Sequence, residues 1–292
     1  MPSRGGRGGR APSKSWGRLK PVEQDPLEAI GLPSKGDTRL LNHEAQRKYY
    51  VKIIERYLAF CTDAGEREEL LRRCASLELD TGTAQPGSGA APAPTRDKDI
   101  SDVLMALRKL REGLVASKRH DEFTVQVYLF CIRVSIMAKQ PEAYHPAILR
   151  LIRWIHPRCP LTAIELQEVV GYLVLDAACR RGQLAEAFEI RREFQLQNDK
   201  INMALKALVH DNYVMFEKMR RVLPGHCARI MEYARKEVRL QTLKCFGRTY
   251  MSVELDFLEA ATDSAWEDLT KRDGVGWELD GSRVVIRKVK AR

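Results

Sequence analysis

Residues 277–287 read WELDGSRVVIR and decide the fold of the C-terminal end of the chain. Two short runs rich in apolar residues, separated by a turn that contains glycine, predict a β-hairpin. The turn falls at Asp280-Gly281 or at Gly281-Ser282. Either turn puts four apolar side chains on one face of the hairpin, namely Trp277, Leu279, Val284 and Ile286.

Three helical segments precede this hairpin. A long helix ends near Tyr250, and shorter helices are predicted over 252–262 and 264–272. Asp263 or Ser264 opens the last of them, because Glu267 follows at the spacing of a capping box. Three helices followed by a two-stranded hairpin is the order of a winged helix.

Helical periodicity also runs through the centre of the chain. Helices are predicted over 98–118, 121–139, 143–156, 161–180, 183–197, 199–209, 211–222 and 225–249. Thr162 and Glu165 have the spacing of a capping box, and prolines fall at or near the predicted helix ends. The sequence therefore predicts an all-α fold. It is an irregular right-handed helical-repeat solenoid, similar to TPR or HEAT stacks, that ends in the winged helix and its small β-hairpin.

Composition divides the chain into five parts. Residues 1–36 form a basic tail with an Arg-Gly-Gly tract, and the prolines in it lead us to expect disorder. Residues 37–79 hold N-terminal helices, and residues 80–96 are a flexible linker rich in Gly, Pro and Ala. Residues 97–250 form the helical-repeat part, and residues 251–292 form the winged helix with a basic tail.

The charge is concentrated at the two ends. The chain carries a formal net charge of +10, of which residues 1–20 hold +6 and residues 271–292 hold +4. No run of about 18 apolar residues predicts a membrane span, and residues 1–20 lack the apolar centre of a secretory signal. The seven cysteines are scattered, which indicates reduced thiols, so we expect a nuclear or cytoplasmic protein.

The order of these segments resembles the PCI domain. The short apolar helix 201–208 is followed by Asp211-Asn212-Tyr213-Val214-Met215-Phe216, which is similar to a corner in the compact PCI proteins. Residues 228–250 lead as one long helix into the C-terminal module. There, residues 252–258 look like the second helix of a winged helix, and residues 277–286 look like its wing.

This resemblance covers about residues 98–290. It is to the small subunits of the proteasome lid, the signalosome and initiation factor three, and to the GANP-type messenger-RNA-export proteins. It implies a non-catalytic scaffold subunit that assembles with other PCI-domain subunits or with a small acidic partner peptide. The tail, the 37–79 helices and the linker have no counterpart in it.

Motifs for catalysis or metal binding do not assemble in this sequence. His43-Glu44-Ala45-Gln46-Arg47 begins like a zincin helix, but Arg47 occupies the place of the second histidine ligand. The cysteines form no Cys-x-x-Cys pair. We therefore expect no catalytic residue, no metal site and no cofactor.

Two sets of residues are candidates for binding. Glu278, Val285 and Arg287 are expected to meet a partner subunit, because the outward strand edge of a lone wing is unpaired. RNA would be held by charge alone through Arg4, Arg7, Arg10, Arg283, Arg287, Lys288 and Lys290. Acidic side chains on the 264–272 helix disfavour reading of a DNA duplex.

The alternative function belongs to another class, an RNA- or DNA-binding factor of mRNA processing, export or ribosome biogenesis. Trp154 bears on this choice, because Arg150, Arg153 and Arg158 surround it in the sequence. Packing of this indole between helices is the favoured interpretation, with the arginines extending into water. Stacking on RNA is the alternative interpretation.

Overall fold

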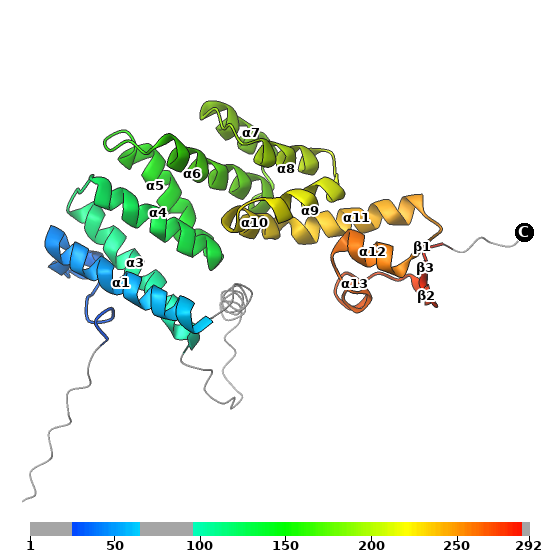
Figure 1. Cartoon of the computed structure of the whole chain (residues 1–292), viewed down its shortest axis with the longest axis horizontal. Coiled ribbons are helices and arrows are strands. Elements are labelled where there is room, and N and C mark those ends of the chain that lie inside the picture. The colour runs from blue at the N-terminus through cyan, green and yellow to red at the C-terminus, as the bar shows by residue number, and fades with distance from the viewer. Residues whose placement is uncertain (1–24, 65–95, 288–292) are drawn as a thin grey trace, which may run out of the picture.

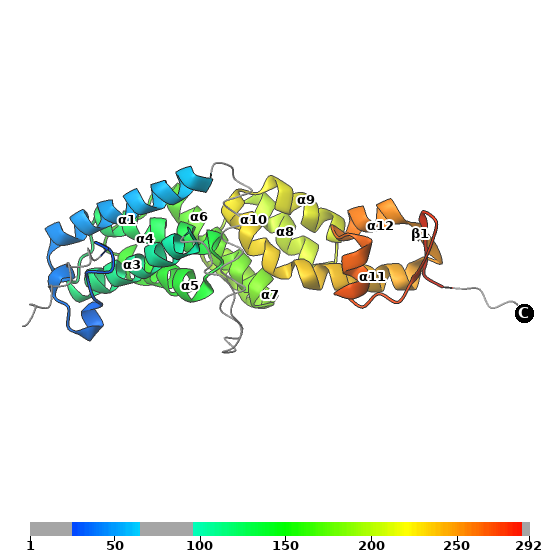
Figure 2. The ribbon, with the colours of Figure 1, turned by 90° about the horizontal axis from the view of Figure 1, so that it is seen from below.

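The computed structural model describes residues 25–64 and 96–287. It is mostly helical, and its helices stack along an elongated body (Figure 1, Figure 2). The N-terminal helices lie at one end and a small antiparallel sheet lies at the other. This arrangement confirms the expected run of stacked helices before a C-terminal sheet.

Neighbouring helices pack in pairs: α1 with α3, α4 with α5, α6 with α7, and α8 with α9. The first group of helices is α1 (His43–Ala64), α3 (Arg96–Ala116), α4 (Glu122–Met137), α5 (Pro141–Arg150), α6 (Ala163–Leu175) and α7 (Leu184–Glu193). The second group is α8 (Asp199–Val209), α9 (Tyr213–Val222), α10 (Gly225–Met231), α11 (Arg235–Thr249), α12 (Leu255–Thr262) and α13 (Trp266–Lys271).

Several helices contain irregular turns. A π-helical turn, Leu151–Ile155, extends α5, and another, Asp176–Arg180, extends α6. The helix expected over 225–249 is interrupted by a 3₁₀ turn at Glu232–Ala234. The capping box of Thr162 and Glu165 is confirmed at the start of α6, because each side chain accepts the backbone N–H of the other residue.

Residues 25–36 correct the expected extent of the N-terminal tail. Leu27 is buried, and its carbonyl oxygen accepts hydrogen bonds from Tyr49 Oη at 2.9 Å and Lys109 Nζ at 3.0 Å. The segment therefore packs on α1 and α3, since its leucine gains an apolar site that the sequence pattern alone does not reveal. The remaining tail, the helix expected in 65–79 and most of the linker lie outside the described residues.

Helix α1 shares one core with the helices that follow residue 96. Tyr49 and Ile53 are buried in the same cluster as the leucines of α3. The fully buried Gln46 donates to the Leu40 carbonyl at 2.8 Å and accepts from Arg119 at 2.9 Å. Because buried amides are costly unless they are hydrogen-bonded, this network fixes α1 against the corner between α3 and α4.

Helix α11 connects two hydrophobic cores. Ala234, at its N-cap, and Val238 pack with the large core of the helical stack. Leu243 and Phe246, two turns further along, belong to the smaller core of the C-terminal module. The module is therefore a continuation of the stack on one shared helix.

The C-terminal sheet has three antiparallel strands in the order β1-β3-β2. They are β1 (Ser252–Glu254), β2 (Glu278–Asp280) and β3 (Arg283–Val285). The hairpin is confirmed, and its turn is Gly281-Ser282. Gly281 has a φ of 60°, which suits a turn with glycine in its first central position.

Two local predictions for this module are wrong. The helix expected over 252–262 begins only at Leu255, because Val253 enters the sheet opposite Val284. Neither Asp263 nor Ser264 caps α13: the N-cap is Ala265, and Glu259 accepts the Trp266 N–H at 2.6 Å instead.

In the described part of the chain, no helix combines the length and the hydropathy that crossing a membrane requires.

Candidate functional site

The core of the C-terminal module is built around an aromatic cluster. The Phe246 ring lies 5.2 Å from that of Tyr250, 5.7 Å from that of Phe257 and 6.2 Å from that of Tyr213, between centroids. Tyr213 comes from α9, so the cluster also ties the module to the helical stack. Tyr250 and Phe257 are about half exposed, which leaves aromatic surface beside the sheet.

One face of the sheet covers this core. Val253 and Val284 lie opposite one another and are buried. Trp277 and Ile286 pack at the edge of the same core, as the hairpin pattern predicted. Leu279 pairs with Val284 and so shares the inner face, but its side chain is 42% exposed because it stands on an edge strand.

The opposite face of the sheet is predominantly acidic. Glu254 and Asp280 flank Arg283 on the two neighbouring strands, and Glu278 lies opposite Val285. Arg283 Nε is 3.2 Å from Glu254 Oε1, so this pair partly neutralises itself. Three carboxylates and one guanidinium give this face a negative charge.

The register shows where the expected partner-binding residues lie. Val285 was expected to point away from the core, and its neighbour Val284 is indeed the buried residue of the strand. Its backbone is not at an open edge, because β3 pairs with β1 on one side and β2 on the other. Arg287 donates to the carbonyl oxygen of Gly247 in α11. Glu278 lies on an exposed edge strand.

The backbone of Leu279 points away from the sheet. The Ile286 N–H donates to Met251 O at 2.9 Å and the Leu255 N–H to Ser282 O at 2.8 Å. Hydrogen-bonded pairs alternate along an antiparallel ladder, so Val284 directs its N–H and C=O toward β1. Leu279, opposite Val284 on the other side, therefore directs its own N–H and C=O outward. Among the described residues, no strand pairs with this edge of β2.

Of the residues expected to hold RNA, the structure describes only Arg283 and Arg287. Arg283 faces carboxylates and Arg287 binds α11, as described above. The other expected contacts, Arg4, Arg7, Arg10, Lys288 and Lys290, lie outside the described residues. The described wing therefore offers a phosphate backbone less positive charge than the sequence suggests.

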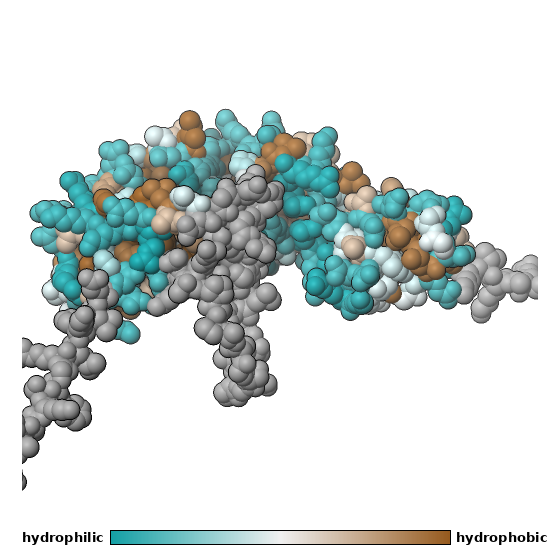
Figure 3. All heavy atoms as spheres, turned by 60° about the horizontal axis from the view of Figure 1, so that its bottom comes forward, coloured by the Kyte–Doolittle hydropathy of each residue, from teal (hydrophilic) through white to brown (hydrophobic). Residues whose placement is uncertain are grey.

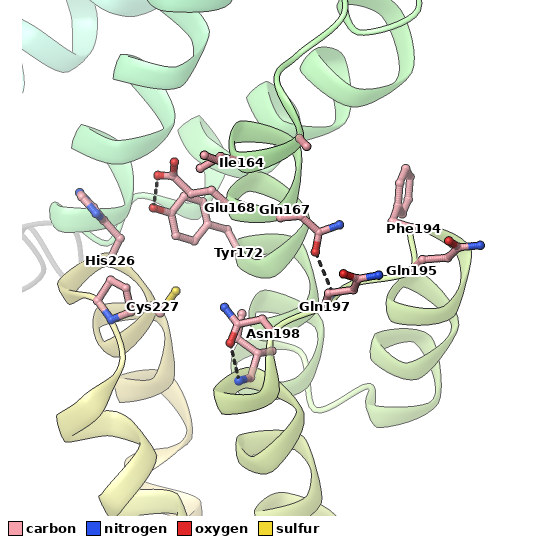
Figure 4. A pocket seen from close by; sticks show the side chains of 13 residues that line it. Ile164, Gln167, Glu168, Tyr172, Phe194, Gln195, Gln197, Asn198, His226 and Cys227 are labelled. Atoms are coloured by element: carbon pink, nitrogen blue, oxygen red, sulfur yellow. Dashed lines mark hydrogen bonds between the residues drawn. The ribbon is translucent and has the colours of Figure 1, made fainter.

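A cleft of about 690 Å³ lies between the start of α6, the turn that joins α7 to α8, and the start of α10 (Figure 4). Its polar groups serve to hold these helices. Gln167 accepts the backbone N–H of Gln197 at 2.8 Å, and Asn198 accepts that of Ile201 at 3.2 Å. Sequence reasoning missed this cleft, because its walls come from three separate segments.

The chemistry of this cleft does not favour covalent catalysis. Burial raises the pKa of the Cys227 thiol to about 12, so the nucleophilic thiolate is scarce at neutral pH. Burial alone would raise the pKa of Glu168, but hydrogen bonds from Arg133 and Tyr172 lower it below its usual value. In the part of the chain that the structure describes, no cluster of three or more His, Cys, Asp or Glu residues is suited to a metal.

Trp154 lies on the surface, at the π-helical turn after α5. Its side chain is 51% exposed, so the expectation that it packs between helices is wrong. The buried residues of the same turn are Leu151, Ile152 and Ile155, which take the inward positions.

A scan against protein-family models and a search of the curated proteins found no match to this chain.

Proposed function

We propose that this protein is a non-catalytic scaffold subunit of a multiprotein complex, of the PCI type. In this proposal the helical stack is a right-handed solenoid, and the C-terminal module is a winged helix. The module joins a partner subunit by adding the partner's strand to the outer edge of β2. The expected partner is another PCI-domain subunit.

The order of elements supports the winged helix. Helix α11 is followed by β1, then by α12 and α13, then by β2 and β3. A helix, a strand, two helices and a hairpin, with the middle position in the sheet taken by the last strand, is the arrangement of that motif. Its continuity with the stack through α11 matches the PCI resemblance of the sequence.

The observation that carries the proposal is the exposed edge of β2. All three residues of this strand are exposed, and the Leu279 backbone groups point away from β3. An edge with an unpaired N–H and C=O is a template for another strand, and proteins protect such edges unless they use them. The half-exposed Leu279 side chain supplies apolar surface on this strand.

The charge on the outer face of the sheet favours a protein partner over a phosphate backbone. The carboxylates of Glu254, Glu278 and Asp280 outnumber the single guanidinium of Arg283. Such a face repels RNA, whereas a protein strand with basic side chains suits it. The sheet therefore supports assembly as the primary activity and disfavours the wing as an RNA-binding surface.

Site-specific photocrosslinking tests this proposal. A photoreactive phenylalanine analogue is placed at Leu279 in the full chain, and as a control at Val51, an exposed apolar position on α1. The proposal predicts one crosslinked partner from position 279 that survives RNase treatment and is absent from position 51. Equal crosslinking from both positions, or a crosslink that RNase removes, would overturn it.

A further inference from the structure

A basic aromatic surface lies on the helical stack, far from the sheet (Figure 1). The guanidinium carbon of Arg150 is 5.2 Å from the centre of the Trp154 ring, and that of Arg158 is 5.9 Å from it. Arg158 also donates to the Trp154 carbonyl at 2.8 Å. The exposed indole is therefore flanked along the helix by two cations, of which Arg158 is also held by a hydrogen bond.

This surface has an excess of positive charge. Arg153, on the same turn, is exposed as well. Across the described ranges, no carboxylate forms an ion pair with Arg150, Arg153 or Arg158, although most of the other ion pairs there involve arginine. In this respect the three guanidinium groups differ from Arg283 on the sheet, which pairs with Glu254.

His120, near these arginines, has a ring nitrogen without a hydrogen-bond partner among the described residues. This atom, Nδ1, is buried. Desolvation is the main cause that lowers the pKa of His120, and the nearby positive charges of Arg158 and Arg150 lower it further. The two arginines therefore lie close enough to affect this imidazole, and an anion bound between them would relieve the repulsion.

The positive charge continues from Trp154 into a cleft of about 730 Å³. Arg150 lines this cleft, together with Arg111 and with the segment that precedes α1. The Nε atom of Arg111 is buried and lacks a partner within the described residues. The cleft's carboxylates are already engaged, Asp37 by Arg39 and Glu112 by Ser34 and Arg108. Figure 3 shows one face of the molecule, on which hydrophilic residues surround small apolar patches.

We propose that this surface binds single-stranded nucleic acid, with one base stacked on Trp154 and the phosphates bound by Arg150, Arg153 and Arg158. The strand continues toward the cleft lined by Arg111. A half-exposed indole, set among cations that carry no paired carboxylate, is the combination that binds single strands with little sequence preference. The indole favours a nucleic acid over an acidic peptide, because every base offers a ring to stack on it and a carboxylate does not.

This inference goes beyond the proposed scaffold function and does not rest on it. The surface lies on the turn after α5, whereas the partner edge is β2 at the other end of the body (Figure 1). Substitutions at Trp154 should therefore leave the crosslink from position 279 unchanged. Failure of one proposal would not imply failure of the other.

Tryptophan fluorescence of the full chain tests the site. The probes are oligouridine RNA and oligothymidine DNA, each about 12 nucleotides long, and an oligoglutamate peptide of similar length. Stacking on Trp154 should quench its emission when RNA or DNA is added, and the two probes identify which strand is preferred. The chain holds four tryptophans, so the contribution of Trp154 is measured as the difference in quench between wild type and Trp154→Phe. Binding through the chain ends alone would leave this difference at zero, so the readout separates the two modes.

Three variants complete the test. Trp154→Ala should remove the part of the quench that comes from Trp154 and weaken binding about ten-fold, measured by anisotropy of a labelled oligonucleotide. Trp154→Phe should retain most of the affinity, because a smaller ring still stacks. Val51→Ala, at an exposed apolar position on α1, should behave as wild type. Unchanged affinity of Trp154→Ala, or quenching by oligoglutamate but by neither oligonucleotide, would overturn the proposal, and the second outcome would indicate an acidic protein partner.

Discussion

Leu279 and Val284 lie directly opposite one another on neighbouring antiparallel strands, as a pair that exchanges no backbone hydrogen bonds. Val284 uses its N–H and C=O to bind β1, so Leu279 turns its own toward the outside of the sheet. This relationship makes β2 the open edge of the module. Leu279 therefore has two roles. Its side chain lies on the core face of the sheet, and its backbone N–H and C=O are available to a partner.

Two glycines should respond in opposite ways to the same substitution. A Cβ atom on Gly113 in α3 would lie 2.7 Å from the Leu40 carbonyl oxygen, whereas one on Gly247 in α11 would lie 3.5 Å from Trp277. Gly113→Ala should therefore lower the free energy of unfolding by about 1–2 kcal/mol, because backbone cannot give way cheaply. Gly247→Ala should raise it by about 0.5–1 kcal/mol, because alanine favours the helix and meets only an ordinary contact. Urea denaturation measures both, and a loss at Gly247 would contradict this packing.

Asp176 should make stability depend on acid pH. It is fully buried and accepts hydrogen bonds from Tyr144 at 2.7 Å and Arg180 at 2.6 Å. Burial alone would raise its pKa, but these hydrogen bonds lower it below its usual value. A lowered pKa stabilises the fold above the pKa of the unfolded chain, and this contribution disappears as the pH falls through the folded value.

Asp176→Asn should accordingly lower the free energy of unfolding by about 3 kcal/mol at neutral pH, since it leaves Arg180 without its counter-charge. The difference from wild type should shrink below about pH 4. Glu44→Gln, which breaks an exposed pair with Lys48, is the control and should leave thermal stability unchanged at both pH values. A constant difference across this pH range would show that Asp176 acts by packing alone.

Cleavage between α1 and α3 should not separate the two pieces. The composition of residues 80–96 predicts that proteases cut there first. Tyr49, Ile53 and the Gln46–Arg119 hydrogen bond join α1 to the rest of the core, so both fragments should elute together in size-exclusion chromatography. A stable C-terminal fragment that elutes without the N-terminal one would make α1 a separate unit.

Nucleic acid should raise the pKa of His120. The guanidinium groups of Arg150 and Arg158 contribute to its lowered pKa, and bound phosphates would offset their charge. Binding then takes up a proton, so affinity should increase as the pH falls from about 7.5 to about 6. Proton NMR titration with and without oligouridine measures this, with His120→Gln to assign the resonance. An unchanged His120 pKa in the complex would place the phosphates elsewhere.

Local signals in the sequence were enough for much of the fold. The capping box of Thr162 and Glu165 and the turn at Gly281 depend on residues a few positions apart, and both were found in the sequence. Leu27 was missed because its partners, Tyr49 and Lys109, lie far along the chain. Burial that depends on distant residues leaves no periodic signal in a short segment.

The candidate sites were harder to predict for the same reason. Residues 252–254 carry a helical pattern, and only their register opposite β3 makes them a strand. Without that strand, the sequence does not show which strand of the hairpin is the open edge. Arginines lie four residues before and after Trp154, and this pattern fits a buried or an exposed indole equally well. Only the position of the π-helical turn decides that Trp154 is exposed.

Co-purification of a Leu279→Pro variant tests the central claim most directly. Proline removes the N–H that points outward and breaks no β2–β3 hydrogen bond, so stability should change by less than about 1 kcal/mol. Leu279→Val keeps that N–H and serves as the matched control, while Glu278→Pro removes an inward N–H and should destabilise the module. Quantitative mass spectrometry after affinity purification of the full chain should detect the partner subunit with wild type and with Leu279→Val. The partner subunit should be lost with Leu279→Pro. A folded Leu279→Pro variant that retains the partner at the wild-type level would contradict assembly through the edge of β2.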